Sequence, residues 1–102
     1  MTAREMLADI PLTVRKGRST EIVVQVGTQA VEARPLARQR VTLQRWDPKA
    51  AKWRVMARTT TDALGEASFG ATFESRTRVR VRVDAADGVP ALYSSGVVRV
   101  TR

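Results

Sequence analysis

The sequence predicts an all-β domain, an antiparallel β-sandwich of about seven short strands. Residues 78–83 alternate strictly between arginine and valine, and a period of two is the pattern of a strand with one buried and one exposed face. Turn-forming residues recur at intervals of roughly 8 to 12 residues, which is typical of sandwiches. No helical pattern of useful length lies between the strands, so a parallel α/β sheet is not expected.

The individual strands follow from runs of β-branched and alternating apolar residues between turn signals. We expect a first strand from Pro11, and further strands at 21–26, 41–46, 53–58, 67–73, 76–84 and 92–101. Residues 47–52 read as a polar hairpin turn, and residues 59–65 as a turn built on Asp62 and Gly65. The expected core residues are Leu12, Ile22, Val24, Val41, Leu43, Val55, Phe69, Val79, Val81 and Val98.

The first eight residues are predicted to be a short N-terminal arm, and residues 9–102 the sandwich domain. The stretch from Glu5 to Ala8 favours a helical turn, although a segment of this length is not stable alone. We therefore expect the arm to pack on this domain or on a neighbour. The 102 residues suffice for one domain with a single hydrophobic core.

The chain is strongly basic, with 18 Lys or Arg against 10 Asp or Glu, a net charge of +8 and a pI of about 11.4. One interpretation is a genome rich in G and C, which favours arginine codons over lysine codons. The basic residues fit this, because Lys16, Lys49 and Lys52 are the only lysines. A second is attraction to an acidic surface. Specific nucleic-acid binding is not favoured, since no recognised motif accompanies the charge.

Catalytic chemistry is not expected. The chain has no histidine and no cysteine, so it lacks the commonest general base, the commonest zinc ligand and any thiolate. Asp62 with Glu66 supplies too few ligands for a calcium loop, and Ser94 and Ser95 have no evident activating base. We predict no enzyme activity, no metal and no cofactor. No apolar run approaches the roughly 18 residues of a membrane span.

The arginine row is the first candidate binding site. Arg78, Arg80 and Arg82 share one strand face, about 6.5–7 Å from each to the next. Neighbouring strands add further candidates if their register allows, namely Arg45, Arg40 and Arg99. Such a face can bind carboxylates of a partner protein through bidentate hydrogen bonds. The alternative is a solvated face that prevents edge association.

Three aromatic residues are the second candidate site. Trp46, Trp53 and Tyr93 form a surface on which a sugar ring can stack. The alternative is packing, because the two tryptophans flank the same predicted turn and can form a cross-strand pair. A shift of register by one residue would exchange which tryptophan is buried.

Several motifs together resemble a known family. Residues 35–45 (PLARQRVTLQR) precede Trp53, and residues 61–69 (TDALGEASF) carry a threonine–aspartate–x–x–glycine–x–x–x–phenylalanine pattern. Residues 77–81 and 97–100 are the remaining stretches that carry the resemblance. In all but residues 1–8, the sequence resembles bacterial immunoglobulin-like (Big-type) domains, which are common in actinobacterial surface proteins and in virion proteins of phages that infect such hosts.

This resemblance implies a seven-stranded immunoglobulin-like sandwich with a non-catalytic role. Surface members usually occur in tandem behind a signal peptide, whereas this sequence shows one copy and no signal pattern, which favours a virion protein over a surface stalk. Because the sequence opens with Met1 and shows no tag or linker, we expect a complete gene product rather than an excised module. We predict a phage virion accessory protein, a capsid decoration or tail component, that binds a protein lattice or copies of itself. The alternatives are a stalk or glycan-binding module at the cell surface, and a polyanion or nucleic-acid binder.

Overall fold

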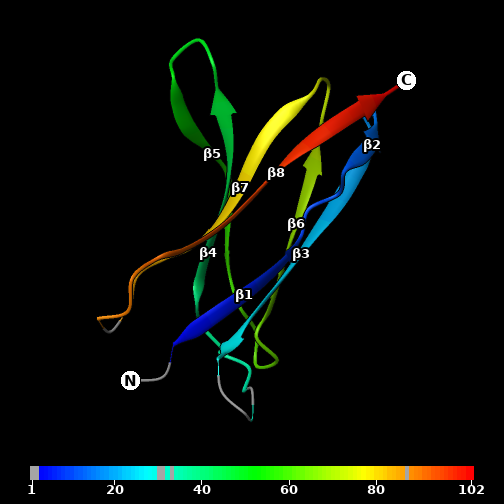
Figure 1. The fold of residues 1–102 in the computed structure, drawn as a ribbon. Coiled ribbons are helices and arrows are strands. Elements are labelled where there is room, and N and C mark those ends of the chain that lie inside the picture. The colour runs from blue at the N-terminus through cyan, green and yellow to red at the C-terminus, as the bar shows by residue number, and fades with distance from the viewer. Residues whose placement is uncertain (1–2, 30–31, 33, 87) are drawn as a thin grey trace.

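The computed structural model describes residues 3–29, 32, 34–86 and 88–102 as eight strands in two packed sheets (Figure 1). The strands are β1 (Arg4–Asp9), β2 (Thr13–Arg15), β3 (Ser19–Thr28), β4 (Arg40–Asp47), β5 (Lys52–Thr60), β6 (Glu66–Thr72), β7 (Thr77–Val83) and β8 (Leu92–Thr101). One sheet has the order β1-β3-β6, and the other has the order β2-β8-β7-β4-β5. The predicted all-β, two-sheet architecture is confirmed, whereas the predicted count of seven strands is wrong. The predicted antiparallel pairing is also wrong for β2, which pairs parallel with β8. Among the described residues, no helix is long and apolar enough to cross a membrane.

The additional strand is β1, which occupies most of the predicted N-terminal arm. Its sequence contains good helix formers, yet it pairs antiparallel with β3 along its whole length. This pairing satisfies backbone N–H and C=O groups that a lone helical turn would leave open. The predicted helical turn is therefore wrong for residues 4–8, which pack on this domain as a strand, and Met1 and Thr2 lie outside the described residues.

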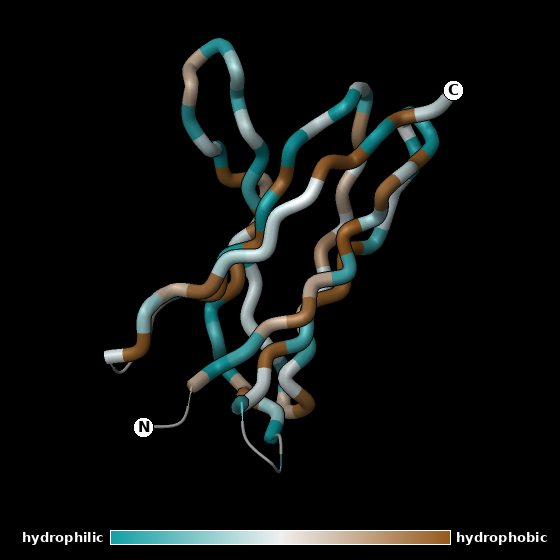
Figure 2. Tube along the Cα trace, in the orientation of Figure 1, coloured by the Kyte–Doolittle hydropathy of each residue, from teal (hydrophilic) through white to brown (hydrophobic). Residues whose placement is uncertain are grey.

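The core lies between the sheets and comes from the inward side of each alternating strand. Figure 2 shows hydrophobic and hydrophilic residues alternating along these strands. The buried apolar side chains are Val14, Ile22, Val24, Val26, Val41, Leu43, Ala67, Phe69, Ala71, Phe73, Val79, Val81, Val83 and Val98. Two predicted core residues, Leu12 and Val55, are instead 77% and 44% exposed. Leu12 lies where the chain crosses from one sheet to the other, so the alternation of β2 does not extend to it.

The turn that precedes β6 is hydrogen-bonded to the end of β3. The Asp62 carboxylate accepts hydrogen bonds from the backbone N–H groups of Leu64 (2.9 Å) and Glu66 (3.0 Å). Gly65 has a φ of 74°, and its carbonyl accepts a hydrogen bond from the N–H of Val26 at 2.8 Å. The predicted turn on Asp62 and Gly65 is confirmed, and it packs directly against β3.

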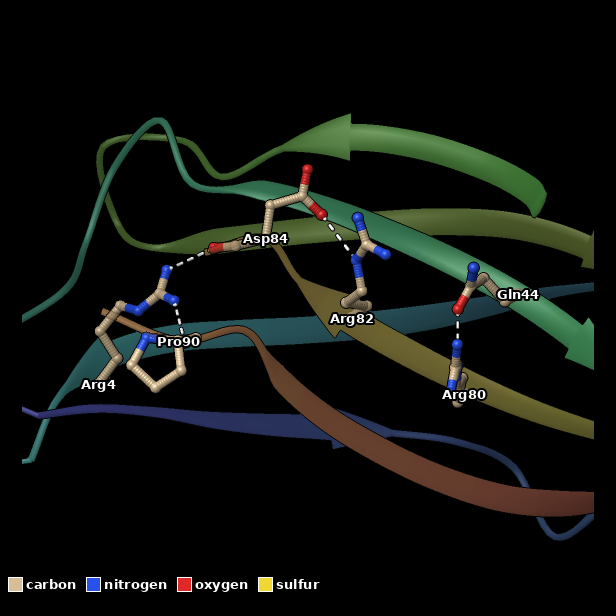
Figure 3. Close-up of polar contacts among 6 residues, drawn as sticks. All are labelled: Arg4, Gln44, Arg80, Arg82, Asp84 and Pro90. Carbon is tan, nitrogen blue, oxygen red and sulfur yellow. Dashed lines mark hydrogen bonds and ion pairs between the residues drawn. The ribbon is translucent and has the colours of Figure 1, made fainter. Parts of the chain in front are cut away.

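Arg4 is a buried charge that links β1 to the opposite sheet. Its guanidinium donates to the side-chain oxygen of Gln39 at 2.9 Å. It also donates to the backbone carbonyls of Asp84 at 3.0 Å and Pro90 at 2.7 Å, which Figure 3 shows. These acceptors lie just before β4, just after β7 and just before β8. Because a buried guanidinium without acceptors is costly, these bonds hold the three segments against β1.

We expect Gly65→Ala to lower the free energy of unfolding by at least about 2 kcal/mol. A Cβ atom at Gly65 would lie 2.4 Å from the carbonyl oxygen of Val26, and the positive φ also disfavours alanine. Gly70→Ala is the matched control, because a Cβ atom there meets nothing within 4 Å. Urea unfolding followed by tryptophan fluorescence compares the two variants. Equal effects would contradict the role given to the turn.

Candidate functional site

The five-stranded sheet presents a basic face on the side away from the three-stranded sheet. Alternation on β7 buries its valines and leaves Arg78, Arg80 and Arg82 outside. The register extends this face sideways, because Gln44 lies opposite Arg80 and Tyr93 lies opposite Arg82. We call it the arginine face. Its residues are Arg40, Thr42, Gln44 and Trp46 of β4, Trp53, Val55, Arg58 and Thr60 of β5, Arg78, Arg80 and Arg82 of β7, and Tyr93, Ser95, Val97 and Arg99 of β8.

A β-bulge decides which residues of β5 reach this face. Ala57 lies opposite the core residue Leu43, whereas Val55 lies opposite the outward-facing Gln44. The extra β5 residue at this shift reverses the alternation, so both Val55 and Arg58 point outward. Simple alternation predicts Val55 in the core, and the bulge is the reason why that prediction is wrong.

Two arginines and three aromatic rings interleave on the arginine face. The guanidinium carbon of Arg78 lies 5.4 Å from the ring centroid of Trp46 and 5.7 Å from that of Trp53. The guanidinium carbon of Arg80 lies 4.4 Å from the Trp53 centroid and 4.8 Å from the Tyr93 centroid. The two tryptophan rings meet edge to face, with centroids 5.4 Å apart. We call these five residues the arginine–aromatic cluster.

The arginine–aromatic cluster holds positive charge in defined positions. Each guanidinium faces the electron-rich surface of a ring, which attracts the cation. Arg80 is fixed further, because its Nε donates to the side-chain oxygen of Gln44 at 2.6 Å (Figure 3). Arginine can stack on an aromatic ring through the flat surface of its guanidinium, an arrangement that leaves in-plane N–H groups for a carboxylate.

Arg82 is fixed by an ion pair on its own strand. Its Nε donates to a carboxylate oxygen of Asp84 at 3.0 Å. The hydrogen bond from Arg82 to Asp84 and the charge of that carboxylate raise the pKa of Arg82 above its ordinary value. Beneath these long side chains, Thr42 and Gln44 are only 5% and 8% exposed although they point away from the core.

The β4–β5 hairpin places the two tryptophans opposite each other. One carboxylate oxygen of Asp47 accepts hydrogen bonds from the N–H groups of Lys49 (3.0 Å) and Ala50 (3.2 Å), and the other accepts one from Arg54 Nε. The hydrogen bond from Arg54, followed by that from Ala50, lowers the pKa of Asp47 below its ordinary value. This network fixes the turn, so Trp46 and Trp53 face each other across the hairpin.

A depression of about 590 Å³ opens on the arginine face beside the cluster. Arg40, Arg58 and Arg82 line it together with the hydroxyls of Thr42 and Thr60. Asp84 also lines it and pairs with Arg82, so the charge of the described lining residues is still positive. Guanidinium and hydroxyl donors around one hollow suit a carboxylate ligand.

The predicted basic residues divide between the two sides of the sheet. Arg99 belongs to the arginine face, because it lies two residues after Val97 on β8 and therefore on the same side. Val97 itself pairs with the outward-facing Arg78. Arg45 does not belong to it, because it lies opposite Val79 and so leaves the sheet on the valine side of β7. That part of the prediction is wrong, since register and not proximity in sequence decides the side.

The two candidate sites of the sequence form one surface. The three predicted aromatic residues all lie on the arginine face, where they stack with Arg78 and Arg80. Stacking of a sugar ring and binding of a partner here stay predictions. Sequence reasoning did not include Arg58, although simple alternation with Ala57 inward already places Arg58 outward. Asp84 was detectable, because it shares the alternation of the arginine row.

No family model and no curated protein matches the chain. Its fold is similar to that of a superoxide reductase (neelaredoxin) from Ignicoccus hospitalis, with a TM-score of 0.68, 9% identity and coverage of 97% of this chain and 80% of that one. The sulfur carrier protein SoxY from Chlorobium limicola f thiosulfatophilum gives a TM-score of 0.57 at 18% identity, covering 100% and 82%. A β-glucosidase from Listeria innocua gives 0.55 at 15% identity, covering 97% and 16%. At these identities the likeness shows the fold alone.

These comparisons contradict the predicted function. The solved structures of highest TM-score among those named are superoxide reductases, which are not virion proteins. The prediction of a phage virion accessory protein relied on sequence motifs that resemble a family of β-sandwich domains, and a two-sheet β fold of this kind is shared by proteins with other roles. The virion role is withdrawn, and the stalk and polyanion-binding alternatives with it. The predicted family and location stay predictions.

The described residues contain no group of three or more His, Cys, Asp or Glu side chains suited to hold a metal ion. The superoxide reductases are enzymes by name, and at 8 and 9% identity their likeness to this chain shows the fold alone. The comparisons thus establish a shared fold and leave the arginine face as the chemically distinctive feature of this molecule.

We expect Arg80→Lys to destabilise the protein by about 1 kcal/mol. Lysine keeps the charge but loses the flat group that stacks on Trp53 and Tyr93, as well as the Nε donor to Gln44. Arg58→Lys is the matched control on the same face, and its expected effect is below about 0.5 kcal/mol. Thermal unfolding by circular dichroism compares them. An Arg80→Lys variant as stable as the control would mean that stacking contributes nothing.

Proposed function

We propose that this chain is a binding module that uses the arginine face to hold an acidic segment of a partner protein. The observation that carries this proposal is the arginine–aromatic cluster with its neighbouring depression. There, guanidinium groups are positioned by stacking and by the hydrogen bond to Gln44. This proposal concerns recognition and does not include a catalytic step.

The chemistry of arginine supports an acidic protein ligand. A guanidinium offers paired N–H donors that match the two oxygens of a carboxylate. Free arginine side chains lose about 2 kcal/mol of rotamer entropy when they are immobilised. Arg78 and Arg80 are already held by aromatic rings, so part of that loss precedes binding.

The depression supports a defined anchoring point on this surface. Arg40 and Arg58 approach it from two neighbouring strands, and the hydroxyls of Thr42 and Thr60 add neutral donors. A single Asp or Glu side chain fits a hollow of about 590 Å³ with room for adjoining residues. The exposed apolar surface of Val55 and Tyr93 suits the aliphatic parts of such a segment.

We further propose that the sandwich is of the immunoglobulin-like kind. The strand order β1-β3-β6 against β8-β7-β4 supports this, since it corresponds to the immunoglobulin order A-B-E against G-F-C. The turn on Asp62 and Gly65 also supports the resemblance, because it occupies the motif that carries it. The superoxide reductase activity is not proposed for this chain, which has no histidine and no cysteine.

The test is binding of a fluorescein-labelled peptide of alternating Glu and Gly, measured by anisotropy. We expect the arginine-face variant, which combines Arg40→Gln, Arg58→Gln and Arg99→Gln, to weaken binding at least about tenfold. Its matched control combines Arg18→Gln, Arg45→Gln and Lys52→Gln, which removes equal charge away from the arginine face. We expect the control to bind within about twofold of the original chain, because screening limits the effect of distant charges.

A duplex DNA oligonucleotide serves as a second probe. If both triple variants weaken peptide binding equally, or if DNA binds as tightly as the peptide and responds equally to both, the attraction is to net charge alone. Either result would overturn the proposal. A loss confined to the arginine-face variant, with the peptide preferred over DNA, supports it.

A further inference from the structure

The outward side of the three-stranded sheet carries charge of the opposite sign. Alternation on β1, β3 and β6 buries one side of each strand in the core. On the other side lie Glu5 and Asp9 of β1, Glu21 of β3 and Glu66 of β6, all exposed. The outward strand residues of this sheet include no lysine or arginine. We call this surface the acidic face.

The acidic face also has an apolar centre. Leu7 is 72% exposed and lies between Glu5 and Asp9 on the same side of β1. Val23 is exposed directly opposite Asp9. A hollow of about 660 Å³ opens at one end of this face, lined by Glu5, Leu7, Arg34, Leu64 and Glu66 among others. Carboxylates beside exposed apolar groups suit an arginine or an aromatic side chain of a partner.

The two sheets therefore give one chain both halves of a complementary pair. The arginine face combines guanidinium groups with exposed Tyr93 and Val55, and the acidic face combines carboxylates with exposed Leu7 and Val23. We infer that the acidic partner of the arginine face is the acidic face of a second copy of this chain. This inference rests on the proposed function and names its partner.

The geometry dictates how such copies would join. The two faces lie on opposite sides of the sandwich, so one copy contacts the next head to tail and keeps a face open at each end. The molecule extends 44 and 26 Å along its two longer axes, which leaves room for the roughly 800 Å² that each partner buries in a stable interface. The net charge of +8 opposes this approach at long range, but salt at physiological strength screens repulsion beyond about 8 Å.

Sedimentation velocity on complementary variants tests the inference. The acidic-face variant combines Glu5→Gln, Glu21→Gln and Glu66→Gln, and keeps the arginine face intact. The arginine-face variant defined above keeps the acidic face intact. We expect the original chain to form dimers and longer species at concentrations of about 10 to 100 µM. We expect each variant alone to sediment as a monomer, and the mixture of the two to give a dimer that grows no further.

Glu74→Gln, in the turn after β6, is the control for the acidic-face variant, and we expect it to associate like the original chain. Circular dichroism verifies that each variant is folded. A monomeric original chain, or a mixture of variants that stays monomeric, would overturn the inference.

The peptide assay then separates the inferred partner from the proposed function. If the acidic-face variant still binds the Glu–Gly peptide, only the second copy is the wrong partner, whereas loss of peptide binding by the original chain overturns the proposed function as well.

Discussion

The pairing of β4 with β7 is the constraint on which both the core and the arginine face depend. In this register Val41 lies opposite Val83 and Leu43 opposite Val81, so four fully buried side chains meet at the centre of the core. The same register sets Gln44 beside Arg80 on the outside. A slip of one residue would exchange the two sides of the strand, sending arginines into the core and valines to solvent. The cost of burying a guanidinium without partners makes this register unique.

The arginine row on β7 is stable because its neighbours offset the repulsion of like charges. Two charges about 7 Å apart in water repel by roughly 0.6 kcal/mol, and salt lowers this further. A single cation–π contact at an exposed site contributes about 0.5–1 kcal/mol, so one contact per arginine is sufficient. Arg78 and Arg80 each have two such contacts, and Arg82 has the carboxylate of Asp84. The aromatic rings thus offset the repulsion between the neighbouring guanidinium groups.

The comparisons separate fold from function in this molecule. A reductase, a sulfur carrier and part of a glycosidase share its fold at identities of 9 to 18%. Fold similarity at this level does not select a role, because the same sandwich can carry unrelated surfaces. In this chain, arginines on one sheet and carboxylates on the other divide a protein of net charge +8 into two unlike faces. This polarity directs the proposed function toward association with proteins.

The sequence alone determined the alternating strands, most of the core and the side of β7 on which its arginines lie, because period-two patterning is local. Val79, Val81 and Phe69 are buried as their own neighbours in sequence predict. Only the tertiary structure decided that residues 4–9 form a strand, because pairing with β3 outweighs weak helix propensity. It also decided which residues join the arginine face. Register excluded Arg45, a bulge admitted Val55, and cross-strand neighbours merged two separate candidate sites into one cluster. These outcomes depend on contacts between segments far apart in the chain, which local patterning does not encode.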